Sequence, residues 1–427
     1  MNLYIVIAPT HEKYTGDFDY AQFLFDQLKS SLSNMDIVEI FLVTSRDEID
    51  DMHKRSKENT IGVVHIIYPT LKGKRIGTGC LLLEKDILSL KKQKAIYICD
   101  PIEVLRFDHS NKEDRYKNAL EYHRLCYENA EHIVVHTQLE VKTLVGYYRI
   151  KKEKISIIQI PSTVPMPKIH DEDKFTTYNN GVICFGMIKK LKGIEEVLGF
   201  ARYLRNQECY ERKVIVAGNT ATTATTPEFL AWILGEYYES SEYILGLIGG
   251  IRLEETDAKK QLCLLHDANK DKIKTNLEIY FDITPEQAND IFSRCSYSFY
   301  FYHNQGLSIR LSSFKNCIAR GLYTFSFDGH STVDLSEHDL SLCWYKLGNR
   351  DTCIGAAQYE EMYSRILAIE QNPEEQQLIR EKMKSASHLA DSESSEIRNL
   401  LATLFSVPNA LEPDSVVKMD GQNKHLS

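Results

Sequence analysis

Three short segments of the sequence place glycine and cationic or hydroxyl side chains directly after an apolar run. In the first, FGMIKKLKG, Gly186 ends the apolar run, and Lys189, Lys190 and Lys192 follow it. Lysines held beside the start of a helix bind anions, and the expected anion is a phosphate or a diphosphate. A lysine loop that faces solvent is the other interpretation, and the segment by itself leaves both open.

The second segment, VIVAGNT, places Gly218 and Asn219 at the end of an apolar run. Glycine is favoured where the backbone approaches a ligand closely and also where the chain turns sharply. Most strands that end in glycine only turn, so this segment indicates a strand end and leaves the ligand contact open.

The third segment, NQGLSIRLSSFKNCIARG, carries Gly306, Ser308, Arg310 and Ser313 just before a run that reads as a helix. Hydroxyl groups, free backbone amides and an arginine together could hold a diphosphate without a bound metal. Serine is also a favoured N-cap of helices. Ser313 is therefore interpreted either as the N-cap of the following helix or as a ligand contact.

These segments belong to a repeated alternation of strand-length apolar runs and amphipathic stretches. LYIVIAP, GVVHIIYPT, KAIYICD, GVICFGM and KVIVAGN are rich in valine and isoleucine and are separated by helix-period sequences. Continuous apolar runs indicate strands that are covered on both faces, which is typical of a parallel doubly wound sheet. In such sheets ligands bind outside the carboxyl ends of the strands, where the three segments lie.

The length of 427 residues and one polar interruption predict two such sheets. The interruption, PMPKIHDEDKFTTYNN, is interpreted as a linker. We therefore expect a Rossmann-like domain over residues 1–170, a second over 178–390, and a C-terminal helix and tail over 391–427. The two domains should face one another across a cleft.

Composition excludes several functional classes. Hydrophobic residues make up 43% and charged residues 26%, which is ordinary for a globular protein. The net charge of -9 disfavours a nucleic-acid partner. Apolar runs are too short for a membrane helix or a signal peptide, and the ten cysteines include no CxxC pair, so reduced thiols, no metal site and a cytoplasmic location are expected.

Considered jointly, the three segments resemble the C-terminal domain of GT-B glycosyltransferases, in the large retaining family that uses nucleotide-sugar donors. FGMIKKLKG is similar to the family segment that binds the donor diphosphate, with Lys189 at the position of an arginine and Lys192 at that of a lysine. One branch of the family carries G.S.R..S.....A.G. The present sequence matches it at Gly306, Ser308, Arg310, Ser313, Ala319 and Gly321.

The N-terminal half is similar to the same family. THEKYTGDFDYAQFLFDQL resembles the glycine loop and first helix that face the donor phosphates, with Gly16 as the matching glycine. GVVHIIYPT and NAEHIVVHTQLEVKTL are similar to two further strand regions. The resemblance covers about residues 1–340 and implies the GT-B fold, two Rossmann-like domains.

Three features differ from the usual family pattern. Met187 follows Gly186 where some members have an arginine, a role in which Lys189 can serve. The family usually has two glutamates on the final loop and helix, where Ser308 and Asn316 stand here. Both can donate or accept hydrogen bonds to a sugar or a ribose but carry no charge.

A family histidine near the sugar is replaced by Cys99, and Asp100 follows it as the expected contact to sugar or acceptor. His65, in an apolar run, and His123, on a helix, are interpreted as structural.

The resemblance implies a retaining, metal-independent hexosyltransferase without a cofactor, whose substrate is a UDP- or GDP-sugar. The acceptor would be a glycan, a lipid-linked glycan or a protein. Lys189, Lys192 and Arg310 would stabilise the leaving diphosphate, and Gly16 and Gly218 would allow close backbone approach. The alternative is an inactive GT-B protein that acts as the partner of an active transferase. A peripheral contact with the inner face of the membrane also stays open.

Overall fold

A computed structural model of the protein describes most strands and helices of the chain. The described residues are 1–7, 16–29, 37–67, 82–90, 93–99, 113–158, 180–190, 192–220, 225–238, 255–270, 275–301, 306–309, 311–329, 332, 335, 338–349, 354–386, 396, 399–400 and 403–404.

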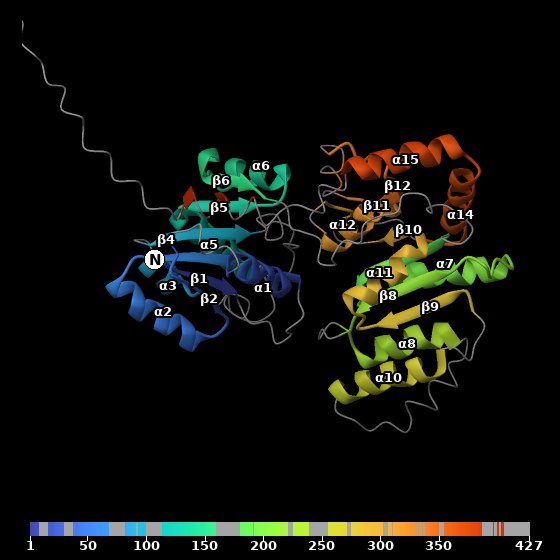
Figure 1. Cartoon of the computed structure of the whole chain (residues 1–427), viewed down its shortest axis with the longest axis horizontal. Helices are drawn as coiled ribbons and strands as arrows, with labels where there is room; N and C mark the ends of the chain where they lie inside the picture. The colour runs from blue at the N-terminus through green and yellow to red at the C-terminus, as the bar shows by residue number, and fades with distance from the viewer. Residues whose placement is uncertain are drawn as a thin grey trace, which may run out of the picture.

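The N-terminal part is a parallel six-stranded sheet in the order β2-β1-β3-β4-β5-β6 (Figure 1). Its strands are β1 (Asn2–Ile7), β2 (Glu39–Val43), β3 (Ile61–Ile67), β4 (Lys94–Cys99), β5 (His132–Val135) and β6 (Ile155–Ile157). Its helices are α1 (Gly16–Lys29), α2 (Arg46–Glu58), α3 (Glu84–Ser89), α5 (Glu113–Asn129) and α6 (Gln138–Gly146), and a 3-10 turn (Lys152–Lys154) precedes β6.

The C-terminal part is a second parallel six-stranded sheet, in the order β12-β11-β10-β7-β8-β9. Its strands are β7 (Gly181–Met187), β8 (Val214–Asn219), β9 (Leu277–Phe281), β10 (Cys295–Tyr300), β11 (Tyr323–Asp328) and β12 (Trp344–Asn349). Its helices are α7 (Ile194–Asn206), α8 (Pro227–Tyr238), α10 (Glu255–Asn269), α11 (Pro285–Ser293), α12 (Ser312–Ala319), α14 (Ala356–Glu370) and α15 (Pro373–Ala386).

Both faces of the N-terminal sheet are covered, as the apolar runs predict. Successive residues of β1 pack into different cores, because side chains alternate across a strand: Leu3 and Ile5 lie in one cluster, and Tyr4 and Val6 lie in the other. Burial of each large apolar side chain contributes about 1.5–3 kcal/mol. The two clusters confirm a doubly wound sheet.

Each sheet reverses its strand order at one point. In the first, β2 lies on one side of β1 and β3 on the other; in the second, β8 and β10 flank β7 in the same way. A crevice forms at such a point, outside the carboxyl ends of the two strands that diverge. Ligand chemistry is therefore sought after β1, β7 and β10.

The end of the described chain returns to the N-terminal domain. Leu400 and Leu404 pack against the core cluster that contains Leu3 and Ile5. Lys94 Nζ, at the start of β4, donates a hydrogen bond to the carbonyl oxygen of Leu404 at 2.8 Å. The predicted boundary between the two domains, at residues 171–177, lies outside the described residues, and so do the last residues of the predicted tail.

Among the described residues, no helix is both long enough and apolar enough to cross a membrane.

Candidate functional site

The first and second segments come together because β7 and β8 are neighbours in register. Gly186 pairs with Gly218, and Met187 pairs with Asn219. After the strands, the backbone N–H of Ile188 donates to the carbonyl oxygen of Asn219 at 3.0 Å. The loop that carries Lys189, Lys190 and Lys192, called the lysine loop below, therefore begins directly beside the carboxyl end, or exit, of β8.

The glycine at position 218 is explained by strand packing. A Cβ built on Gly218 would lie 1.5 Å from the carbonyl oxygen of Gly186, a distance at which no side chain fits. Gly186 itself has φ 138°, which favours glycine. The predicted ligand contact at Gly218 stays a prediction, because the neighbouring backbone already requires this residue.

Lys192 is held between the β7 and β10 exits by the glycine that follows it. Gly193 is the N-cap of α7 and has a left-handed φ of 82°. A Cβ there would lie 2.7 Å from Cβ of Phe301, the residue after β10. Cys184 Sγ on β7 donates to the carbonyl oxygen of Lys192 at 3.9 Å. These contacts place Lys192 where the strand order reverses.

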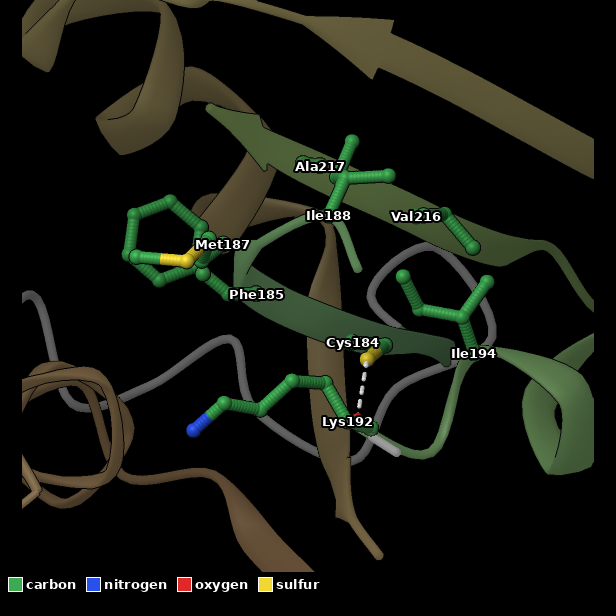
Figure 2. A pocket seen from close by; sticks show the side chains of 9 residues that line it. Cys184, Phe185, Met187, Ile188, Lys192, Ile194, Val216 and Ala217 are labelled. Atoms are coloured by element: carbon green, nitrogen blue, oxygen red, sulfur yellow. Dashed lines mark hydrogen bonds between the residues drawn. The ribbon is translucent and has the colours of Figure 1, made fainter. Parts of the chain in front are cut away.

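A small hollow of about 10 Å³ lies under this loop. It holds no more than about one water molecule. Its lining consists of Cys184, Phe185, Gly186, Met187, Ile188, Lys192, Ile194, Val216 and Ala217. In Figure 2 the side chain of Lys192 extends away from the apolar lining. Burial raises the pKa of the Cys184 thiol to about 12, so the thiol is uncharged at neutral pH.

Helix α7 carries its own acidic residues at its N-terminus. Glu195 and Glu196 lie in the first turn, where carboxylates interact favourably with the helix dipole. Anion binding at this helix therefore depends on the cations of the loop. Lys189 and Lys192 are half-buried, whereas Lys190 is exposed.

The third segment begins after β10, which pairs with β7. Gly306 has φ 72°, and a Cβ there would lie 2.7 Å from the backbone nitrogen of Gly329, after β11. Ser308 is buried, and its carbonyl oxygen accepts a hydrogen bond from the backbone of Leu311. Arg310, the predicted diphosphate contact of this segment, lies outside the described residues.

The prediction of Ser313 as an N-cap is wrong. Helix α12 begins at Ser312, and its N-cap is Leu311, whose side chain makes no capping hydrogen bond. Ser313 therefore lies inside the first turn. Its carbonyl oxygen accepts a hydrogen bond from the Tyr300 hydroxyl at 2.8 Å, which ties α12 to the end of β10. The predicted ligand contact at Ser313 is left untested.

Asn316, at the position of the second family glutamate, is fully buried and accepts hydrogen bonds from Arg320. Arg320 Nη1 donates to Asn316 Oδ1 at 3.2 Å and to the Asn316 carbonyl oxygen at 3.1 Å. Arg320 also donates to Asn289 on α11 and lies over the ring of Phe292 at 4.7 Å. Its burial lowers its pKa to about 10. This network joins α12 to α11.

Sequence reasoning missed a polar clamp across the β8 and β9 exits. Asp282, directly after β9, accepts hydrogen bonds from Thr220 N at 2.7 Å and from Thr220 Oγ1 at 2.6 Å. The N–H of Asp282 donates to the carbonyl oxygen of Gly218 at 2.7 Å. Asp282 has φ 51°, a conformation that costs a non-glycine residue free energy. The clamp fixes the backbone on both sides of Asn219.

Lys315 was also missed, and it is completely buried on α12. Burial lowers its pKa to about 7, and the charge of Glu396 acts in the opposite direction. Six consecutive residues of α12, from Phe314 to Ala319, are buried, so the helix has no solvent face that a periodicity analysis could detect.

The N-terminal candidates are placed less completely. Gly16 begins α1, while Asp100 and the loop after β1 lie outside the described residues. Cys99 ends β4 and is buried in the core. His65 is buried on β3, where its ring packs edge-on against Tyr97 at 5.4 Å, as the structural interpretation predicts. His123 is buried, and its Nδ1 lies 2.9 Å from the Tyr127 hydroxyl.

Within the described part of the chain, no group of three or more His, Cys, Asp or Glu side chains is arranged to hold a metal ion.

No protein-family model and no curated protein sequence matches this chain. Several solved structures, in contrast, are similar to it. A glycosyltransferase from Rickettsia africae ESF-5 is similar with a TM-score of 0.51 and 11% identity, over 94% of this chain and 98% of that one. The GtfA/B complex matches with a TM-score of 0.50 and 12% identity, over 85% of this chain and 60% of that one, so this chain spans less than two thirds of its length.

The protein has the GT-B fold. The predicted fold class is thereby confirmed. The N-terminal domain of Candida albicans trehalose-6-phosphate phosphatase is also similar, with a TM-score of 0.50 and 9% identity over 94% of both chains. At such identities the likeness concerns the fold, and the activity of this GT-B protein has to be argued from its own residues.

Proposed function

We propose that the protein is a glycosyltransferase that moves a sugar from a nucleotide-diphosphate sugar to a glycan, lipid-linked or protein acceptor. The observation that carries the proposal is the convergence of three strand exits at the reversal point of the C-terminal sheet. Lys189 and Lys192 follow β7, Asn219 ends β8, and Gly306 and Ser308 follow β10. This is the edge at which open parallel sheets bind ligands.

The side chains at this edge suit a leaving diphosphate. As the bond between sugar and phosphate breaks, negative charge grows on the phosphate oxygens, and positioned cations stabilise that charge. Two half-buried lysines next to the N-terminus of α7 supply positive charge, while Gly193 against Phe301 holds the loop in place. Arg310 is proposed as a third cation.

The proposed transfer retains the anomeric configuration and uses neither a metal nor a protein nucleophile. The leaving phosphate oxygen takes the proton of the acceptor hydroxyl on the same face of the sugar, and the acceptor oxygen forms the new bond. The protein then contributes charge stabilisation and orientation. Asp100 is proposed to orient the sugar or the acceptor.

A second candidate is an inactive GT-B protein that binds an active transferase. Asn316 favours it, because the Oδ1 atom that could accept from a ribose hydroxyl already accepts from Arg320. The absence of a carboxylate at Ser308 points the same way.

Product analysis separates the two candidates. The purified protein is incubated with UDP-, GDP- and ADP-sugars, with and without cell extract as the acceptor source, and products are detected by mass spectrometry. The proposal expects slow release of nucleoside diphosphate from one donor and transfer with extract, and NMR of the product should show the anomeric configuration of the donor. Nucleotide binding without hydrolysis or transfer would support the inactive partner.

A further inference from the structure

The outer surface at the border of the N-terminal sheet carries cations and apolar side chains together. Figure 1 shows α6 and β6 at this border, beyond β5, and β6 is an edge strand. We name this surface the α6–β6 rim. It consists of the exposed residues Lys142, Val145, Tyr147, Arg149, Lys151 and Lys152.

The rim is a positive surface on a negative protein. Between residues 142 and 154 the chain has five lysine or arginine side chains against one carboxylate, Glu153, although the whole chain has a net charge of -9. Lys154 Nζ donates to the carbonyl oxygen of Ala130 at 2.9 Å. Arg149, Lys151 and Lys152 form no ion pair with any residue that the structure describes.

The backbone exposes these side chains between buried anchors. From 147 to 151, exposed and buried residues alternate, with Tyr148 and Ile150 in the core. Arg149 has a left-handed φ of 62°, and the N–H of Ile150 donates to the carbonyl oxygen of Leu144 at 3.0 Å. The rim backbone is therefore held in a fixed conformation by the buried residues Tyr148 and Ile150.

Apolar side chains accompany the cations. Tyr147 is 45% exposed and Val145 is 38% exposed. The Tyr147 ring packs edge-on against buried Tyr148 at 5.0 Å, which limits its freedom. Tyrosine is enriched at the boundary between membrane and water because one end of the ring is apolar and the other is polar.

We infer that the α6–β6 rim binds the surface of a membrane that contains anionic lipids. The side chains of Arg149, Lys151 and Lys152 are attracted to anionic headgroups, and each contributes when it lies near the membrane surface. Tyr147 and Val145 gain by entering the apolar boundary of the bilayer. This combination favours binding to a lipid surface over binding to a nucleic acid, because the apolar side chain of Val145 would contribute nothing to contacts with a nucleic acid. The inference does not depend on the proposed transferase activity.

Vesicle cosedimentation of the full chain tests the inference. Vesicles of phosphatidylcholine alone are compared with vesicles that contain about one third phosphatidylglycerol. The wild-type protein should sediment with the anionic vesicles and should be released when salt rises from about 0.1 M to about 0.5 M, because salt screens the attraction.

Two matched variants locate the surface. Lys151→Glu with Lys152→Glu should lower the partition onto anionic vesicles by on the order of 30-fold or more. The control, Lys54→Glu with Lys57→Glu, changes the net charge equally on exposed α2, where these lysines stand among acidic residues, and should leave most of the binding. Tyr147→Ala should weaken binding with little change in its salt dependence.

Three results would overturn the inference. The first is that the wild-type protein stays in solution with anionic vesicles. The second is that the two charge-reversal variants bind the vesicles equally well. The third is that the rim variant loses affinity for a DNA duplex while its vesicle binding is unchanged. Circular dichroism and thermal unfolding confirm that each variant is folded, which is expected since all the substituted residues are exposed.

Discussion

Gly218 and Gly186 contact one another so closely across β8 and β7 that a Cβ on Gly218 would lie 1.5 Å from the Gly186 carbonyl oxygen. This backbone contact sets the spacing of the two strand exits that frame the candidate site. Gly218→Ala should therefore lower the free energy of unfolding by about 3 kcal/mol or more, because neither backbone can move without breaking the sheet. Urea unfolding measures the change.

Gly146→Ala is the matched control for this substitution. Gly146 is the last residue of α6, and a Cβ there has no atom within 4 Å among the described residues. Alanine should leave stability unchanged or raise it by about 0.5–1 kcal/mol. Equal stability of the Gly218→Ala variant and the wild type would contradict the close contact.

Thr220 should matter for the site through the clamp with Asp282. Thr220→Val removes the hydrogen bond from Oγ1 to the carboxylate, which is 2.6 Å long. We expect a loss of about 1 kcal/mol in the free energy of unfolding and weaker nucleotide binding, since Asn219 is next to the clamp. Thr220→Ser keeps the hydroxyl and should restore both. A Thr220→Val variant with wild-type stability and affinity would show that the clamp has no role.

Buried His65 should make the protein sensitive to acid. Its burial, and then the nearby His123, lower its pKa from 6.5 to about 3, and neither ring nitrogen has a hydrogen-bond partner within the described part of the chain. The folded protein therefore holds His65 neutral, while the unfolded chain binds a proton below pH 6.5. Stability that is present above pH 6.5 is lost as the pH falls toward 3.

The variant His65→Leu isolates this contribution. Between pH 7.5 and pH 5 the wild type should lose about 2 kcal/mol more unfolding free energy than the variant does. Titrating groups that do not interact with His65 contribute equally to both proteins and cancel in the comparison. Parallel pH profiles of the two proteins would show that His65 is not held neutral in the folded state.

The C-terminal segment should stabilise the N-terminal domain. Leu400 and Leu404 are partly buried against its core. Replacing both by alanine should cost about 1–2 kcal/mol, because part of each apolar side chain returns to water. Leu378→Ala on α15 is the control, since Leu378 is 45% exposed. Limited proteolysis and urea unfolding report the change, and a double variant no less stable than the control would argue against the packing.

The fold could be predicted from the sequence because it depends on local patterns. Apolar runs such as GVICFGM and KVIVAGN are long enough for strands and lack alternation, which indicates burial on both faces. The helical stretches between them then require parallel pairing. The order of the strands, and thus the reversal beside β7, was not predicted, because it depends on which distant strands pair and no local pattern carries it.

The site could be predicted only in part, because its contacts join distant residues. Asp282 and Thr220 are 62 positions apart and meet because β8 and β9 are neighbours. The requirement for glycine at 218 depends on the register with β7. Ser313 was misplaced because α12 starts two residues earlier than an N-cap at 313 requires, and capping propensity does not determine a helix boundary. Buried Lys315 had no signal, because its helix has no exposed face.

Nucleotide binding by the lysine loop tests the central claim most directly. Calorimetric titration of the wild type, Lys192→Ala and Lys190→Ala with UDP, GDP and ADP compares a half-buried lysine at the reversal point with an exposed one two residues earlier. The wild type should bind one of the three. Lys192→Ala should weaken that binding at least about tenfold, since a charge-assisted contact is lost, and Lys190→Ala should bind nearly as the wild type does. Binding of none of the three, or equal affinity of Lys192→Ala and the wild type, would contradict a diphosphate site at this edge of the sheet.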